Sequence, residues 1–306
     1  GVCGMFRKKS DAKPLIEKEQ IPYAVLLAPF FILFFLFIFL PVICSIVLSF
    51  FSFDMVSAPS FAGADNYIRM FLDDDVFLTT LKNTLLLAVL TGPAGFLLSF
   101  ILAWFINEFS PRVRTVLSFM FYCPALVGNA LYIWQVAFSN DSYGYANSLL
   151  LSAGLIVEPI NWLKNPTYII PIIVIVQLWM SMGVSFLANI SGLQNINTEM
   201  YEAGAIDGIR NRWQELWYIT LPAMENMLLF SAVMQIASAF SIGSICTTLV
   251  GYPSVNYTAD TIVSYLTDVG TTKYEMGYAC AISVILFLMM ALTRALIGKL
   301  LRRVGR

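Results

Sequence analysis

Six long stretches without a single charged residue divide this chain, and they constrain its fold more than any other feature. They cover residues 20–53, 83–107, 115–140, 165–198, 226–259 and 276–293. A bilayer core about 30 Å thick is crossed by roughly 17 to 25 apolar helical residues, and each stretch contains or nearly supplies that length. The sequence therefore predicts an all-α, polytopic membrane protein with six transmembrane helices, at about 22–51, 83–107, 115–138, 167–190, 225–249 and 275–298.

A seventh uncharged stretch, residues 142–157, has only 16 residues and opens with polar groups, so we expect an interfacial or re-entrant segment rather than a span. With six spans and the amino end inside, 14 of the 18 Lys and Arg residues fall on the cytoplasmic side. A seven-span arrangement would move the last two basic clusters outside. We therefore predict a cytoplasmic tail over residues 1–20, a transmembrane domain over 21–306, and both termini in the cytoplasm.

The composition excludes several classes of function. The chain has no histidine, which removes imidazole bases and His-ligated metal sites, and its net charge of −1 argues against nucleic-acid binding. Five cysteines form no C-x-x-C pair, so they indicate neither a metal site nor a disulfide framework. No charged residue lies at mid-span, where ion-coupled carriers bind their ions, and no Walker A run is present. We expect a non-catalytic chain without a cofactor; any ATP is hydrolysed by another subunit.

Neutral polar and aromatic residues lie within the predicted spans at helical spacing. They could line a path for a polar, uncharged solute, because amides hydrogen-bond hydroxyls and aromatic faces stack on sugar rings. They could equally form hydrogen bonds between helices. Both interpretations stay open for this set, which is Asn129, Tyr132, Gln135, Gln177, Trp179, Gln235 and Ser238.

The loop between the fourth and fifth predicted spans, residues 195–222, is too long for a simple turn. Asn197 or Thr198 can cap a helix that ends at Gly208, where a left-handed residue is favoured. A second short helix over about 210–219 precedes Leu221 and Pro222, which begin the next span. The pattern predicts a compact helix-turn-helix on the cytoplasmic face.

The segments "EAGAIDG" and "ITLP" resemble the EAA loop of permease subunits in binding-protein-dependent ABC importers. The matching residues are Glu202, Ala203, Ala205, Asp207, Gly208, Ile219, Leu221 and Pro222. Two departures are that Gly204 replaces the second alanine and that ten residues rather than nine separate Gly208 from Ile219. The six-span layout, "NYIRMF" and "LKNTLLLAV" are similar to the carbohydrate-uptake branch, which includes the maltose and glycerol-3-phosphate permeases.

The resemblance implies a type I importer permease fold in a bacterial cytoplasmic membrane. It implies that residues 202–208, with Gly204 allowing close approach, form a coupling helix that docks on an ABC ATPase dimer holding ATP and magnesium. A second homologous permease, an extracytoplasmic solute-binding protein, membrane lipid and a carbohydrate are the other implied partners. Import of a polyol phosphate or another small solute is an alternative, and a self-sufficient secondary carrier is a weaker one. The acidic first outer loop, with Asp54 and Asp74, could contact a binding protein or simply be solvated.

Overall fold

The computed structural model of the chain describes residues 21–304, so the predicted tail over residues 1–20 lies outside it. Most of the described chain is helical, in agreement with the predicted class, and one two-stranded antiparallel hairpin accompanies the helices. Two units are distinguished, residues 1–47 and residues 48–306. The first unit holds one interrupted helix, and the second holds the remaining spans and their connections.

The described part of the first unit is a single apolar helix with a π-helical turn in its middle. Helix α1 (Ile21–Phe34) leads into η2 (Phe35–Phe39), which is followed by α2 (Leu40–Leu48). Pro41 has no amide hydrogen, and its ring would crowd the carbonyl one turn earlier. The wider π turn directly before Leu40 and Pro41 relieves that conflict. The helix therefore accommodates Pro41 through a π turn.

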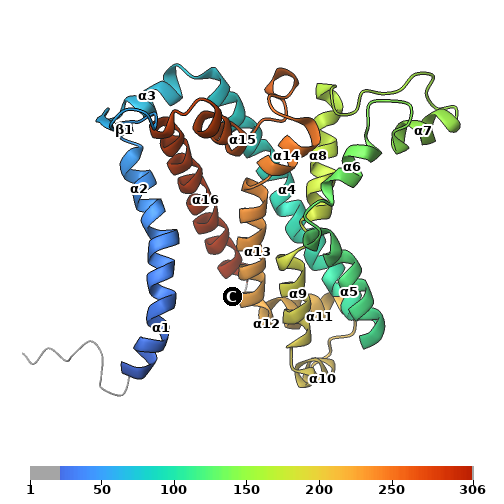
Figure 1. Cartoon of the computed structure of the whole chain (residues 1–306). Coiled ribbons are helices and arrows are strands. Elements are labelled where there is room, and N and C mark those ends of the chain that lie inside the picture. Colours follow the sequence, from blue (N-terminus) through green and yellow to red (C-terminus); the bar gives the residue numbers. More distant parts are fainter. Residues whose placement is uncertain (1–20, 305–306) are drawn as a thin grey trace, which may run out of the picture. The chain divides into compact units, whose positions relative to one another are not determined.

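The second unit begins with a short cap and ends with a long helix. Its elements are β1 (Phe51–Ser52), β2 (Ser60–Phe61), α3 (Asp65–Leu72), α4 (Asp75–Asn107), α5 (Pro111–Leu126), α6 (Leu131–Ala137), α7 (Tyr145–Ser152), α8 (Pro166–Met180), α9 (Val184–Gln194), α10 (Thr198–Ile206), α11 (Arg212–Glu215), η3 (Leu216–Thr220), α12 (Leu221–Ala223), α13 (Glu225–Phe240), α14 (Gly243–Val250), η4 (Val255–Tyr257), α15 (Ile262–Thr267), η5 (Asp268–Thr272) and α16 (Met276–Val304). In Figure 1, α3 and α15 lie at one end of this unit and α10 at the other. We call these the α15 end and the α10 end.

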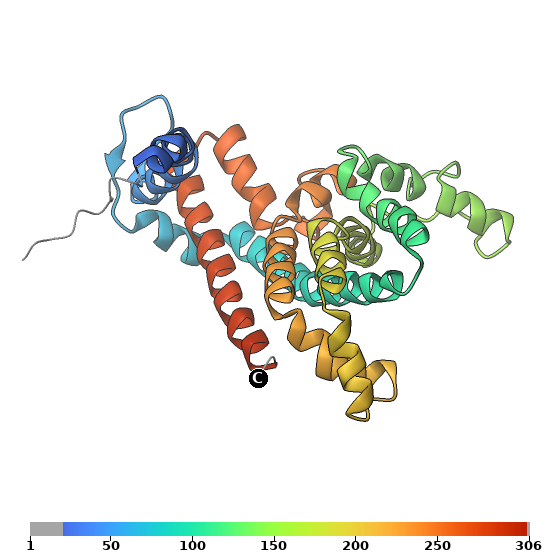
Figure 2. The same ribbon diagram turned by 90° about the horizontal axis from the view of Figure 1, so that it is seen from below.

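Helices α4, α9 and α13 pack against one another at the centre of the second unit, and α16 packs on α13 (Figures 1 and 2). Buried apolar side chains fill the space between them, among them Phe100 of α4, Phe186 of α9 and Leu228 of α13. A second cluster joins α8 to α14 near the α15 end, through Ile173 and Ile245. This central group of helices positions the loop over residues 195–222, which we call the α10 loop. It also positions the polar residues discussed below.

Three of the predicted spans are long helices without a break, and three are bent. Residues Val25–Leu48, Asp75–Asn107 and Met276–Lys299 are each long and apolar enough to cross a membrane. The other three candidates are the pairs Pro111–Leu126 with Leu131–Ala137, Pro166–Met180 with Val184–Gln194, and Arg212–Ala223 with Glu225–Phe240, bent by 84°, 43° and 81°. The count of six is reached only if each bent pair is one span.

These bends correct the span limits expected from the sequence. The stretch 115–138 breaks after Leu126, where Gly128 and Asn129 are poor helix formers. The stretch 167–190 breaks at Gly183, which precedes α9 and where a Cβ atom would lie 3.3 Å from that of Ala125. The stretch 225–249 is divided between α13 and α14, and the helix that contains the second predicted span begins at Asp75. Apolar composition alone does not reveal such breaks.

The α15 end is held together by a polar cluster around Asp74. This residue caps α4 by accepting from the amide of Phe77 at 2.9 Å, and it also accepts from the hydroxyls of Tyr265 at 2.5 Å and Tyr278 at 2.6 Å. Burial raises the pKa of Asp74, whereas these hydrogen bonds and the charge of Arg69 lower it. The lowering effects together are larger, so the net pKa lies below the ordinary value. Asp74 of the acidic outer loop therefore has a structural role, since it joins α4 to residues about two hundred positions later in the chain.

Candidate functional site

The first helix of the α10 loop has the boundaries that the sequence predicted. Asn197 caps it by accepting from the amide of Glu199 at 3.1 Å. At the other end Gly208 has φ +98°, and the amides of Gly208 and Ile209 bond back to the carbonyls of Ala205 and Gly204. This pair of bonds is a Schellman motif, which satisfies the last carbonyls of a helix and reverses the chain. Gly208 therefore ends α10 through a backbone conformation that side chains disfavour.

The second helix of the loop is shorter and less regular than the sequence indicated. One turn of α-helix, α11, is followed by the π turn η3 and then by α12, which contains Leu221 and Pro222. As in the first unit, the π turn lies directly before a Leu-Pro pair. A π turn holds one more residue than an α turn. It thereby accommodates the tenth residue between Gly208 and Ile219, and Ile219 still lies on the buried face of the loop.

Gly204 lies where the two helices of the loop touch. It is buried, and a Cβ atom placed on it would lie 2.6 Å from Cδ1 of Ile219 and 3.1 Å from Cδ1 of Ile209. A hydrogen bond of 3.0 Å between the side chains of Tyr201 and Thr220 closes the same contact. The absence of a side chain at position 204 therefore allows close approach within the loop itself, whereas the resemblance implied close approach to the ATPase.

The outward face of α10 is formed by small and acidic residues and by the most exposed large apolar side chain of the helix, that of Ile206. Glu202, Ala203, Ala205 and Asp207 are all exposed. Ile206, in the last turn, is 87% exposed. The sequence analysis did not identify Ile206 as a functional residue. Its position directly before the predicted helix end was the signal that could have identified it.

Ion pairs and aromatic contacts attach the α10 loop to the end of α4. The guanidinium of Arg212 lies 2.8 Å from the carboxylate of Glu108 and 2.7 Å from that of Glu215. The hydrogen bond that Arg212 donates to Glu215 raises the pKa of Arg212, burial lowers it, and the charge of Glu108 raises it, so that the net pKa lies above the ordinary value. The rings of Trp213 and Trp104 are 5.5 Å apart. Beneath these contacts lies a polar hollow of about 440 Å³.

The structure divides the predicted solute-path residues into two groups. Gln177, Gln235 and Ser238 belong to helix contacts. The amide of Gln177 donates to the hydroxyl of Ser238 at 3.1 Å, and Ser185 donates to Gln235 at 3.2 Å. Both glutamines are almost completely buried. For these three residues the contacts favour hydrogen bonding between helices over a role in the path.

The other predicted path residues lie on and around α6. Asn129, Tyr132 and Gln135 are exposed on the break before α6 and on α6 itself. Trp179 of α8 is partly buried, and its ring meets that of Trp134 edge-on with the centroids 5.4 Å apart. Asn129, Tyr132 and Gln135 are thus available to a solute or a partner, whereas Trp179 is connected to α6 through its contact with Trp134.

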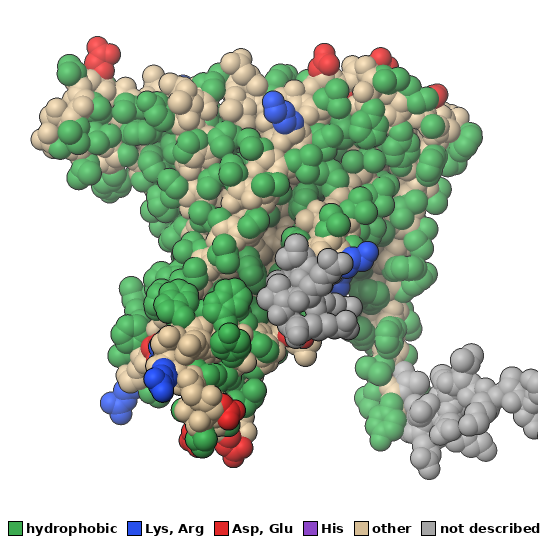
Figure 3. All heavy atoms as spheres, turned by 180° about the vertical axis from the view of Figure 1, so that it is seen from behind, with side chains coloured by type: hydrophobic (Ala, Val, Ile, Leu, Met, Phe, Trp, Pro, Cys, Tyr) green, Lys and Arg blue, Asp and Glu red, His purple; other side chains and the backbone are tan. Residues whose placement is uncertain are grey.

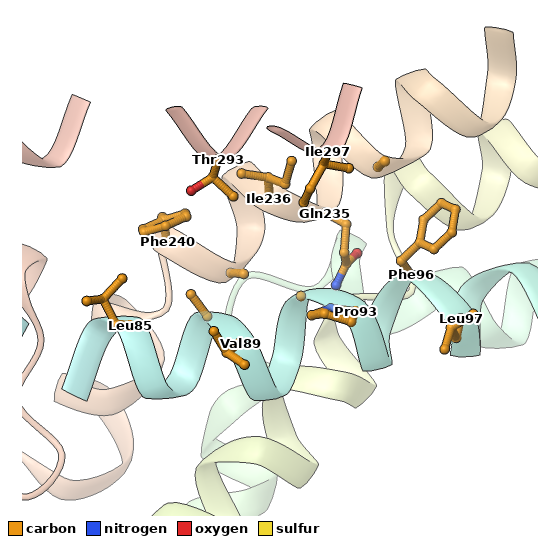
Figure 4. A pocket seen from close by; sticks show the side chains of 14 residues that line it. Leu85, Val89, Pro93, Phe96, Leu97, Gln235, Ile236, Phe240, Thr293 and Ile297 are labelled. Atoms are coloured by element: carbon orange, nitrogen blue, oxygen red, sulfur yellow. The ribbon is translucent and has the colours of Figure 1, made fainter. Parts of the chain in front are cut away.

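Figure 4 shows a cavity of about 420 Å³ between α4, α13 and α16. Its walls are mainly apolar, and Gln235 and Thr293 are the polar side chains that line it. The Gln235 amide points toward Pro93 of α4. Such a lining offers few partners to a solute with many hydroxyl groups, so this cavity is a poorer candidate for the path than α6.

Comparisons with known proteins agree with the resemblance seen in the loop. The family model of the "Binding-protein-dependent transport system inner membrane component" matches residues 95–306. The arabinooligosaccharides transport system permease protein AraP of Bacillus subtilis is 30% identical, over 90% of this chain and 86% of its own. The lactose transport system permease protein LacF of Rhizobium radiobacter is 30% identical, over 67% of this chain and 68% of its own. A chain of a bacterial ABC transporter that imports alginate shares the fold, with a TM-score of 0.77, 24% identity, and coverage of 94% and 98%.

Proposed function

Since the chain belongs to the family of binding-protein-dependent transport system inner membrane components, we propose that it is the permease subunit of an ATP-driven importer of neutral oligosaccharides. The chain itself is a transport component rather than an enzyme, and the ATPase is a separate subunit. It spans the membrane several times, with both termini on the cytoplasmic side. A second, similar permease completes the path, two ATPase subunits supply the energy with bound ATP and magnesium, and an external binding protein delivers the solute.

The observation that best supports this proposal is the exposed face of α10. Ile206 protrudes at the end of the helix, the two exposed alanines allow a partner to approach closely, and Glu202 and Asp207 offer carboxylates to basic groups. A fully exposed aliphatic side chain at a loop tip fits an apolar pocket on a partner, where buried anchors supply most of the binding energy. We propose that this pocket lies on the ATPase.

The docking test compares two variants, each of which replaces an exposed aliphatic residue by asparagine, at opposite ends of the second unit. Ile206→Asn removes the apolar anchor on α10, and Leu72→Asn changes an exposed leucine on α3. Loss of a central anchor costs about 1.4 kcal/mol or more, which is roughly a tenfold weaker affinity. The complex is purified in mild detergent, and the retained ATPase is measured by mass spectrometry. Only Ile206→Asn should lose the ATPase, and equal retention by both variants would contradict docking through α10.

The proposed cargo rests on the residues around α6 and on the relatives. Asn129, Tyr132 and Gln135 present exposed neutral polar groups, and Trp179 contacts Trp134 of the same helix α6. Two relatives carry arabinooligosaccharides or lactose in their names. No basic side chain accompanies these four residues within α6 or α8, so a phosphate or another anion would lack a partner in this part of the described chain.

The cargo is tested with the binding protein that co-purifies with the complex. Calorimetry against neutral oligosaccharides and polyol phosphates should show binding of the former only. Tyr132→Ala should then reduce uptake of the bound sugar while the ATPase stays associated. Transport in liposomes by this chain alone, without ATP, would replace the importer proposal by that of a secondary carrier.

A further inference from the structure

An arm formed by residues 139–163 projects sideways from the second unit at the α15 end (Figure 1). It connects α6 to α8, and its one helix, α7, has eight residues. Eight residues of α-helix extend about 12 Å, less than half of the bilayer core. The uncharged stretch 142–157 therefore does not cross the membrane, which agrees with the sequence expectation that it is not a span.

The arm is fixed at its base by one fully buried side chain, Asn147. Its amide nitrogen donates to three backbone carbonyls, those of Ser139, Asp141 and Ile160, at 3.0 to 3.2 Å. Its oxygen accepts from the amide of Ile160 at 3.0 Å and from the indole of Trp162 at 2.8 Å. All the hydrogen-bonding groups of the amide are used. The chain that enters the arm at residues 139–141 and the chain that leaves it at residue 160 are therefore joined at a defined point.

Beyond this base the arm exposes apolar side chains. Tyr143 and Val157 are 90% and 95% exposed, and Leu149 and Leu155 are each 72% exposed. No charged residue occurs over 142–157. In Figure 3, where the arm extends to the left, an acidic group lies on its edge away from the spans, and apolar side chains cover the edge toward them. The surface is therefore amphipathic, with its apolar side toward the membrane.

Aromatic contacts indicate the depth of the arm in the membrane. Trp162, which bonds to Asn147, lies with its ring centroid 5.9 Å from that of Phe138 and 5.3 Å from that of Tyr168. Tyr168 belongs to the first turn of α8, at the end of a span. Tryptophan and tyrosine at span ends gather at the level of the lipid headgroups. The base of the arm is consequently at headgroup level, and the arm extends sideways from there.

We propose that this arm lies on the membrane and inserts its apolar edge among the lipids of the leaflet at the α15 end. An uncharged, apolar surface that starts at headgroup depth is typical of segments lying in the interface plane. A transient partner such as a binding protein fits less well, because non-obligate interfaces are about as polar as the rest of a protein surface. The proposal does not depend on the transported solute.

The test measures the depth of probes on the arm in the assembled transporter. Single cysteines at Val157 and Leu149, and a control at Glu158, are introduced after the five native cysteines are replaced, and each is labelled with an environment-sensitive fluorophore. The complexes are placed in nanodiscs whose lipids carry bromine at defined acyl positions. Lipid quenching should place the probes at 149 and 157 about 5–10 Å below the headgroups, and the probe at 158 nearer to water.

Three results would overturn the proposal. Unquenched probes at 149 and 157 would mean that the arm is not in lipid. Quenching that disappears only when the binding protein is added, or crosslinks from 157 to that protein, would assign the surface to the binding protein. Crosslinks from 157 to the second permease would make it a subunit interface. Two independent probe positions keep the test valid if one variant fails to assemble.

Discussion

The contact between Gly204 and Ile219 provides the sharpest quantitative prediction for the α10 loop. In Gly204→Ala the new methyl would lie 2.6 Å from Cδ1 of Ile219, so the isoleucine must move. Overpacking of this kind costs about 1–3 kcal/mol, whereas alanine gains about 1 kcal/mol over glycine in a helix. We expect a net loss of about 1 kcal/mol in the local stability of the loop. The alanine of the EAA pattern is thus unfavourable here although it is the better helix former.

A second substitution isolates this contact. Ile219→Val removes the Cδ1 atom that the new methyl would strike, and alone it should cost about 0.5–1.5 kcal/mol because it leaves a small void. In Gly204→Ala/Ile219→Val the alanine methyl fills part of that void. The double variant should therefore be more stable than the sum of the single effects predicts, by about 1 kcal/mol.

Hydrogen exchange measures the effect where it occurs. The amide of Ile209 bonds to the carbonyl of Gly204 at 3.0 Å, so its exchange reports opening of the Schellman turn. A loss of about 1 kcal/mol corresponds to roughly fivefold faster exchange. Gly298→Ala is the matched control, because this helical glycine has no atom within 4 Å of its Cβ position. Slower exchange in Gly204→Ala, or strictly additive effects in the double variant, would refute the packing argument.

Three further predictions concern other parts of the molecule. Gly208→Val should abolish ATPase retention and uptake but not membrane insertion, because β-branched residues avoid φ +98°, and co-purification with uptake assays checks this. Asp74→Asn should lower the unfolding free energy by about 1–3 kcal/mol near neutral pH. Since the folded-state pKa of Asp74 is lowered, this difference should vanish as the pH falls well below about 4 in thermal unfolding, and a pH-independent difference would contradict it. Gln177→Leu should weaken the contact with Ser238 and reduce thermal stability by about 1–2 kcal/mol while sugar selectivity stays unchanged, and an altered selectivity in competition uptake would restore a path role.

The sequence predicted the ends of α10 because local interactions determine them. Asn197 supplies a side-chain acceptor for the first turn, and Gly208 supplies the left-handed backbone for the last. Neither feature needs a distant partner, so the residue types at these positions are sufficient. The six-helix class was accessible for a similar reason, since each span must be a long apolar stretch wherever it packs.

The bends and the roles of the polar residues were not accessible in this way. The 84° bend after Leu126 and the 43° bend at Gly183 leave the apolar composition unchanged, so hydropathy does not detect them. Gln177 and Gln135 have the same side chain, yet one is buried against α13 and the other is exposed on α6. That difference depends on which helices are neighbours, and a single sequence without tertiary contacts does not specify it.

The bends also indicate how a movement of the α10 loop is transmitted to the residues of the proposed solute path. Arg212 ties the loop to Glu108 at the end of α4, and α4 packs against α9 and α13. A force on α10 would therefore act on these three helices together rather than on one of them. Asn129 lies in the break between α5 and α6, and Trp179 lies just before the break between α8 and α9. We therefore expect a change of angle at these two breaks to reorient the exposed amide of Asn129 and the partly buried indole of Trp179, which belong to the proposed path, without any charged residue at mid-span.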